Sequence, residues 1–314
     1  MILNYDHYRA GSRKRRLRIA LIPALSAALV LAIVLIIALR IPSRVFPATG
    51  SRQNVSTLQG LWREENYGEL VHVADAILSN DPLNPSALAY RGFAQFYRAA
   101  SENSSDERAP ILDEAIVSLR RAKLVATAFA GEADYVLGKS YFHKGKYYYD
   151  LAILYMESSL AKGFLQRDSH EYIGLAYTQL GDLEKGMRHF LEALKEDASD
   201  LLLLTIGQTY YQMKRAGDAI DYLLRTLNKT EDTAIEKRAR FLLGEIYFDR
   251  SELFKAEEQY GAIVKIDQQS ADAHFVLGEV YAKMNDTVKA RAEWRNALII
   301  DPSHYGAKLR YYAR

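Results

Sequence analysis

Several chemical groups are missing from this chain of 314 residues, and each absence removes a class of function. There is no cysteine, so disulfide bonds, thiolate metal sites and cysteine nucleophiles are excluded. Neither a G-x-x-x-x-G-K-[ST] phosphate loop nor an H-E-x-x-H zinc motif occurs. The seven histidines are scattered along the chain rather than clustered. We therefore expect no cofactor, no metal site, no small-molecule substrate and no catalytic activity.

Helix breakers and net charge are also scarce. Only seven prolines and 18 glycines interrupt the chain, which favours long helices. The formal net charge is +2, but residues 1–18 hold six basic residues against Asp6 alone, so the rest of the chain is mildly acidic. A nucleic-acid-binding domain would carry its basic residues on the folded part. Nucleic acid is therefore not an expected partner.

One long apolar run is present. Residues 19–39 contain no charge and, as a helix, would span roughly 30 Å, the thickness of a bilayer core. The run is too long for a cleaved signal peptide, so we predict a transmembrane signal-anchor helix. Six basic residues precede it and three follow it closely, which predicts a cytoplasmic segment at residues 1–18. The expected protein is single-pass in a cell (inner) membrane, with its remainder periplasmic or otherwise extracytoplasmic.

Residues 40–57 contain proline, serine and arginine without an apolar period, and we interpret them as a linker. Four asparagines begin N-x-[ST] triplets, which would accept glycans in a eukaryotic lumenal protein and carry no meaning in a bacterial one. These are Asn54, Asn103, Asn228 and Asn285.

The rest of the chain repeats itself. Six segments place a glycine after a bulky residue, and from the second segment onward the glycines recur every 33 to 37 residues. A second small residue follows each glycine, 12 residues later in the regular cases, and a large side chain comes four residues after that. Small residues at such positions let two helix backbones approach closely. The first set is Gly92, Gly138, Gly174, Gly207, Gly244 and Gly278; the second is Ala115, Ala152, Gly186, Ala219, Ala256 and Ala290.

This pattern resembles the tetratricopeptide repeat, a helix–turn–helix unit of 34 residues. The resemblance is fullest near the C-terminus, where Gly278, Ala290, Trp294 and the Asp301-Pro302 pair all fit. It implies an all-α, right-handed superhelical α-solenoid of about six to seven hairpins over residues 58–302, preceded by the single transmembrane helix. No hairpin buries its apolar face alone, so neighbouring hairpins must stack.

Departures from the repeat lead to further expectations. Residues 101–110, which are polar and end in proline, are predicted to form an exposed loop. Residues 58–81 are interpreted as a degenerate first unit, and the hairpin that begins at Gly138 is two residues longer than the rest. Residues 303–314 are predicted to form a C-terminal capping helix.

In the family, the first helix of each hairpin lines a concave groove that binds protein or peptide partners. By this resemblance, three positions of each first helix face the groove: the residue three before the repeat glycine, the residue one after it and the residue four after it. The alternative for each of these side chains is that it packs inside the array and faces no groove. No asparagine follows a glycine, so a carboxylate clamp is not expected. The candidates are Phe93, Phe96, Tyr135, Lys139, Phe142, Gln208, Tyr211, Glu245, Phe248, Phe275 and Glu279.

The function expected from this layout is that of a membrane-anchored scaffold or adaptor, which binds partners for bacterial envelope assembly, secretion or protein quality control. Aromatic and acidic groove positions favour peptides with apolar anchors and some positive charge. Two alternatives stay open. The repeats could lie in the cytosol and recruit soluble client proteins to a membrane, or the chain could be the regulatory subunit of an enzyme bound in trans.

Overall fold

The computed structural model describes residues 48–313, which form fifteen α-helices, α2 to α16, and one 3₁₀ turn. The chain divides into two compact units, Met1–Thr57 and Leu58–Arg314. The predicted membrane span at 19–39 and the basic segment at 1–18 lie outside the described residues. Within 48–313, no helix is both long enough and apolar enough to cross a membrane.

The first described helix contradicts part of the predicted linker. Helix α2 runs from Ala48 to Arg63, so residues 48–57 are helical rather than irregular. These residues contain no proline, and Pro47 comes immediately before the helix in the sequence, where a missing N–H is tolerated. The polar composition of residues 48–57 suggested a linker, but it belongs to a helix whose surface is largely polar.

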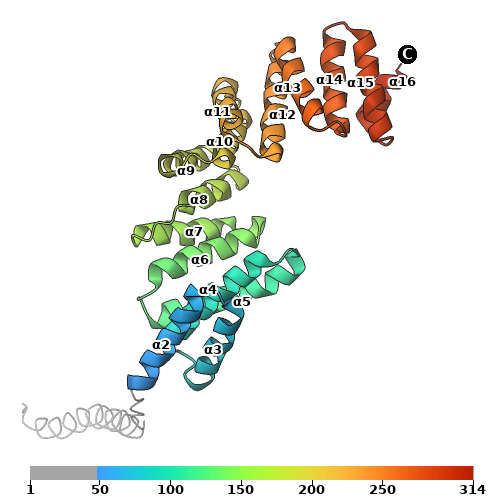
Figure 1. The fold of residues 1–314 in the computed structure, drawn as a ribbon. Coiled ribbons are helices and arrows are strands. Elements are labelled where there is room, and N and C mark those ends of the chain that lie inside the picture. The colour runs from blue at the N-terminus through green and yellow to red at the C-terminus, as the bar shows by residue number, and fades with distance from the viewer. Residues whose placement is uncertain (1–47, 314) are drawn as a thin grey trace, which may run out of the picture. The chain divides into compact units, whose positions relative to one another are not determined.

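Successive helices pair as hairpins, and each hairpin contacts the next, so the second unit is an α-solenoid (Figure 1). Helix α4 pairs with α5, α6 with α7, and so on to α14 with α15, while α16 stands alone. Before them, Leu58 near the end of α2 shares a core cluster with Leu70 and Ala74 of α3. The helices after α2 are α3 (Tyr67–Asn80), α4 (Pro85–Ser101), α5 (Ser105–Val125), α6 (Ala130–His143), α7 (Tyr149–Ala161), α8 (Ser169–Gln179), α9 (Leu183–Glu196), α10 (Asp200–Gln212), α11 (Ala216–Lys229), α12 (Thr233–Asp249), α13 (Leu253–Ile266), α14 (Ala271–Lys283), α15 (Thr287–Ile300) and α16 (Tyr305–Tyr312).

The repeated glycines lie where the two helices of a hairpin meet. A Cβ atom added to Gly174 would lie 2.5 Å from a ring carbon of Phe190 and 3.1 Å from the carbonyl oxygen of Gly186. Gly244 and Gly278 meet Tyr260 and Trp294 in the same way, at 2.5 Å. Each ring belongs to the large residue that the sequence pattern places on the second helix. The predicted close approach of paired helices is therefore present in successive hairpins.

Two hairpins depart from the regular length in different ways. Helix α5 already begins at Ser105, so the exposed loop predicted over 101–110 is wrong and only residues 102–104 connect α4 to α5. Asp106 and Glu107 favour a helix N-terminus, and the Arg108 guanidinium donates a 2.6 Å hydrogen bond to the carbonyl of Glu102. In the hairpin after Gly138, the extra residues form a 3₁₀ turn at Lys146–Tyr148.

An aromatic pocket as the candidate functional site

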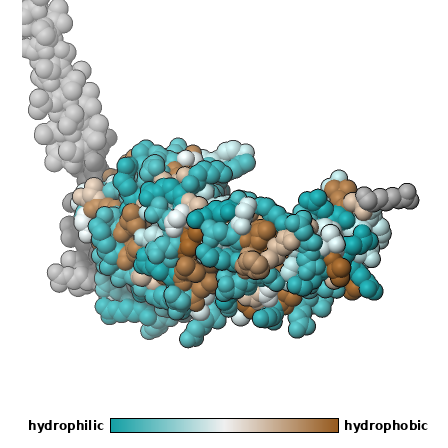
Figure 2. Space-filling model, turned by 90° about the horizontal axis from the view of Figure 1, so that it is seen from above, coloured by the Kyte–Doolittle hydropathy of each residue, from teal (hydrophilic) through white to brown (hydrophobic). Residues whose placement is uncertain are grey.

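Neighbouring first helices of the hairpins contact each other directly, as α4 does with α6, α6 with α8, and α10 with α12. We call the side of the array that carries the first helices (α2, α4, α6, α8, α10, α12 and α14) the first-helix face. Figure 2 shows the apolar residues of one side of the molecule as separate patches in a largely hydrophilic surface. The predicted groove residues accordingly differ in their surroundings. Phe93 and Phe96 are almost covered, with 6% and 3% of their surface exposed, because neighbouring first helices pack directly over them.

The two C-terminal candidates are occupied by α16. Phe275 packs against His304, with ring centres 4.9 Å apart, and Glu279 accepts a 2.6 Å hydrogen bond from the guanidinium of Arg310. Helix α16 sits where the first helix of a further hairpin would sit, so it covers positions that the repeat pattern assigned to an open groove. The structure thus places Phe275 and Glu279 in contacts within the chain.

The middle candidates on α10 and α12 stay partly open. Gln208, Tyr211 and Phe248 are half-buried and Glu245 is exposed. Burial and the neighbouring Glu245 carboxylate raise the pKa of Tyr211 to about 12. The Lys283 ammonium lies 4.3 Å from the ring centre of Phe248. These residues form an exposed polar and aromatic surface rather than a cavity.

Lys139, on α6, is held in an internal cluster. Its ammonium lies 2.8 Å from a carboxylate oxygen of Asp168 and 4.7 Å from the ring centre of Tyr172. The hydroxyl of Tyr135 donates a 2.5 Å hydrogen bond to the same carboxylate, and burial together with this bond raises the pKa of Tyr135 far above its usual value. The cluster fixes α6 to the start of α8. The Lys139 charge is therefore neutralised within the chain. Phe142 lies beside it, with its ring 5.0 Å from that of Tyr172.

Next to this cluster, the first-helix face is hollowed by a cavity of about 320 Å³. Its wall is formed by residues of α2, α4 and α6, by the segment before α6 and by the segment after α7. Seven of the ten lining residues are aromatic, and one, Glu132, has an acidic side chain. The lining residues are Trp62, Tyr90, Phe93, Tyr97, Phe129, Glu132, Tyr135, Val136, Phe164 and Gln166.

Trp62 is the centre of the aromatic wall. Its ring lies 5.4 Å from Tyr97, 5.9 Å from Phe93 and 6.2 Å from Tyr90, mostly in tilted or edge-to-face geometry. Phe129 continues the wall 5.8 Å from Tyr90. Such pairs hold one another in place, so the cavity is preformed in the free chain.

Sequence reasoning found two of the lining residues, Phe93 and Tyr135, and missed the others. Trp62 lies in the degenerate first unit, and Phe129 and Phe164 lie between helices, where the repeat positions give no guidance. The density of aromatic residues between Trp62 and Tyr172 was the available signal. Composition alone does not separate a ring in the core from a ring that lines a cavity.

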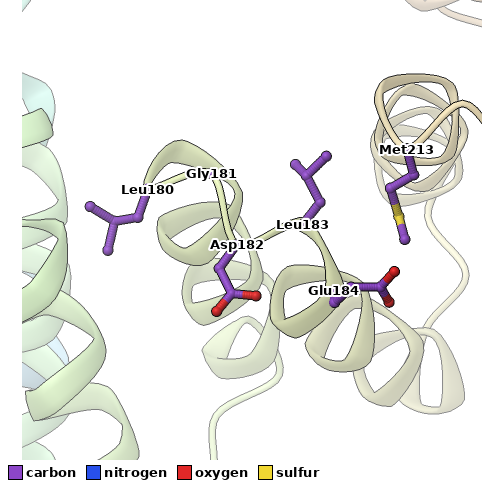
Figure 3. Close-up of a pocket in the computed structure, with 6 residues that line it drawn as sticks. All are labelled: Leu180, Gly181, Asp182, Leu183, Glu184 and Met213. Carbon is purple, nitrogen blue, oxygen red and sulfur yellow. The ribbon is translucent and has the colours of Figure 1, made fainter.

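A second hollow, of about 560 Å³, lies at the turn between α8 and α9 (Figure 3). The labelled side chains point in different directions rather than toward a common centre. Asp182 is already used, since its carboxylate accepts the backbone N–H of Lys185 at 3.1 Å and so caps α9. The hollow is an open turn surface, and we assign no ligand to it.

Two histidines face each other inside the α8/α9 hairpin. The Nδ1 atoms of His170 and His189 are 3.0 Å apart, and the ring of Tyr177 stacks on His189 at 5.7 Å. Burial, and then the nearby His170, lower the pKa of His189. Among residues 48–313 no cluster of three or more His, Asp or Glu could hold a metal ion. The pair is therefore not assigned to a metal.

Acidification is expected to destabilise this hairpin. Because folding lowers the pKa of His189, the unfolded chain binds the proton more readily, and stability falls as pH drops below the ordinary histidine value of about 6.5. Glu157 and Glu192 partly oppose the effect. The melting temperature should fall more between pH 7.5 and pH 5.5 in the native chain than in a His170→Asn variant. Equal slopes in the two proteins would contradict this explanation.

Comparisons with known proteins agree with the repeat. Residues 204–271 and 172–200 match two family models of the tetratricopeptide repeat. The fold resembles the C-terminal part of a tetratricopeptide-repeat protein from Cytophaga hutchinsonii, at 17% identity and a TM-score of 0.65, covering 82% of this chain and 100% of that one. It also resembles MamA from Desulfovibrio magneticus RS-1, at 19% identity and a TM-score of 0.50, covering 57% of this chain and 99% of that one.

At these identities the solved structures show the fold alone. A comparison with curated protein sequences found no match. The chain therefore contains tetratricopeptide repeats, and its described part is an all-α solenoid of stacked helix hairpins. That much of the sequence interpretation is confirmed.

Proposed function

We propose that this chain is a binding scaffold, which holds protein or peptide partners on its first-helix face and performs no catalysis itself. The observation that carries the proposal is the preformed aromatic cavity between α2, α4 and α6. Large aromatic side chains in a preformed recess are the usual anchors of protein recognition. The half-exposed residues of α10 and α12 would extend the contact surface along the array.

Site-specific photo-crosslinking tests this proposal. A photoreactive amino acid replaces Tyr97, which lies at the pocket and is 37% exposed, and in a matched variant it replaces Leu154, which is 59% exposed on the second helix α7. We expect discrete adducts from position 97 and few from position 154 in cells that express each variant. Adducts of equal yield from both positions, or none from position 97, would overturn the assignment of the binding face.

The proposal includes the membrane anchor at residues 19–39, with the repeats on the extracytoplasmic side. The length of the apolar run and the basic residues before it support this part. Bacterial envelope assembly, secretion or protein quality control are the processes in which such a scaffold would act. Alkaline phosphatase fused after the last residue should be active, and green fluorescent protein dark. The opposite result would favour a receptor with cytosolic repeats.

The remaining alternative is a regulatory subunit of an enzyme. It predicts a stable complex of fixed stoichiometry with a catalytic chain, which size-exclusion chromatography of the solubilised protein would reveal. Nothing in the described residues favours it over the scaffold.

A further inference from the structure

We infer that the aromatic pocket binds a cationic side chain, an arginine or a lysine, of a partner polypeptide. This inference rests on the proposed function, because it names the chemistry that the binding face selects. Three observations carry it: the acidic side chain in the pocket, the aromatic rings around it and the acidic residue beside it.

The first observation is the carboxylate of Glu132. It lines the cavity and has neither a hydrogen bond nor an ion pair within residues 54–313. Lys139, the nearest lysine on the same helix, is already paired with Asp168. The pocket therefore holds one net negative charge and no neutralising group. A cationic occupant would pair with that charge.

The second observation is the aromatic wall. The faces of aromatic rings attract cations, by about 0.5–1 kcal/mol at exposed sites and about 2 kcal/mol or more where water is excluded. Trp62, the ring type with the strongest attraction, is at the centre of the wall. The volume of about 320 Å³ is sufficient for a single long side chain.

The third observation is the field around the pocket. Burial, then the carboxylates of Asp168 and Glu65, raise the pKa of Tyr97. Because Asp168 is paired with Lys139, Glu65 is the acidic residue that adds net negative charge beside the pocket. A negative surrounding that disfavours a phenolate favours a bound cation for the same reason. Charge complementarity thus extends beyond Glu132 alone.

An apolar anchor is the competing occupant. It would match the rings, but it would also cover Glu132 and leave that carboxylate without water or a partner. Burying an unpaired charge is strongly unfavourable. The geometry therefore favours the cation over the apolar side chain.

The test uses Trp62 as a reporter. The chain has two tryptophans, and the buried indole Nε1 of Trp294 has no hydrogen-bond partner among the described residues, so Trp294→Phe leaves no polar group unpaired. In the full-length Trp294→Phe protein, fluorescence is titrated with acetyl-Ala-Ala-Arg-Ala-Ala-amide. The same peptide with citrulline is the neutral isostere, and with norleucine it is the apolar one.

We expect the arginine peptide to bind about tenfold more tightly than the citrulline peptide, with affinity that falls as salt is added. Glu132→Gln should reduce this preference to about threefold or less. Glu107→Gln is the matched control, because Glu107 also lies in the first turn of a helix but is exposed and does not line the cavity. It should leave the preference unchanged.

Three results would overturn the inference. The norleucine peptide could bind as tightly as the arginine peptide, Glu132→Gln could leave the preference intact, or no peptide could give a saturable change up to about 10 mM. If one of these results were obtained and crosslinks from position 97 still formed, the first-helix face would bind partners, but not through a cationic side chain. Loss of those crosslinks would instead show that the proposed function fails.

Discussion

Replacing Asp134 by alanine should lower the free energy of unfolding by about 2–4 kcal/mol. The Asp134 carboxylate on α6 is fully buried and forms ion pairs with Lys123 of α5 and Lys162 at the end of α7. It also accepts a 2.7 Å hydrogen bond from the hydroxyl of Ser158. One side chain thus connects three helices, and one of these, α6, also supplies residues to the wall of the pocket.

The charge state of Asp134 supports this expectation. Burial alone would raise the pKa of Asp134, but the hydrogen bonds from Lys123, Lys162 and Ser158 hold it below the usual aspartate value. Because the folded pKa is lowered, the stabilisation is present above the unfolded pKa and is lost only as pH falls through the folded one. The contribution should therefore be complete at neutral pH.

Urea denaturation followed by circular dichroism measures the loss, and hydrogen exchange of the α6 and α7 amides locates it. Asp113→Ala is the matched control, since Asp113 also pairs with a lysine, Lys144, between α5 and α6, but is 57% exposed. It should cost about 1 kcal/mol or less. Similar losses for the two variants would mean that the buried ion pairs contribute no more than a surface pair.

Two glycine-to-alanine changes are expected to have opposite effects. At Gly186 the new Cβ would lie 2.9 Å from the backbone oxygen of Gly174 and 2.5 Å from the Thr178 methyl, so α8 and α9 must separate. We expect a loss of about 1–3 kcal/mol. At Gly261, inside α13, nothing lies within 4 Å of the new Cβ, and alanine should stabilise by about 0.5–1 kcal/mol.

Thermal and urea melts of the two variants test the requirement for close helix approach at the repeat positions. The Gly261 variant controls for the general effect of alanine on helix stability. A Gly186→Ala protein as stable as the Gly261→Ala protein would show that the hairpin seam tolerates a methyl group. The spacing argument would then lose its physical basis.

The sequence was sufficient to predict the hairpins because each one needs the same steric solution. Gly174, Gly207, Gly244 and Gly278 each meet a large side chain 16 residues later, so the pattern reports a contact directly. Where polarity was the only guide, at 48–57 and 101–110, the predictions were wrong, since exposed helix turns and loops have similar compositions.

The pocket was less accessible to prediction because its residues come from different hairpins and from the segments between them. Which rings line a cavity depends on how α2, α4 and α6 pack against one another. The spacing of the repeats does not specify that packing. Phe275 and Glu279 had the right positions for a groove but lie under α16, a helix whose location follows from packing. Position within a repeat predicts the direction of a side chain, not what covers it.

The 3₁₀ turn at Lys146–Tyr148 has a consequence for engineering. It accommodates the extra residues of its hairpin, and Gly138 still lies against Ala152 as the corresponding residues do in the other hairpins. Hairpins of unequal length can therefore replace one another in the array. The two family models begin at residue 172, beyond Gln166, the last residue of the pocket. Grafting residues 58–196, which keep Asp168 beside Tyr135 and Lys139, onto another regular array should therefore transfer ligand preference as a module, with the later hairpins acting as a replaceable spacer.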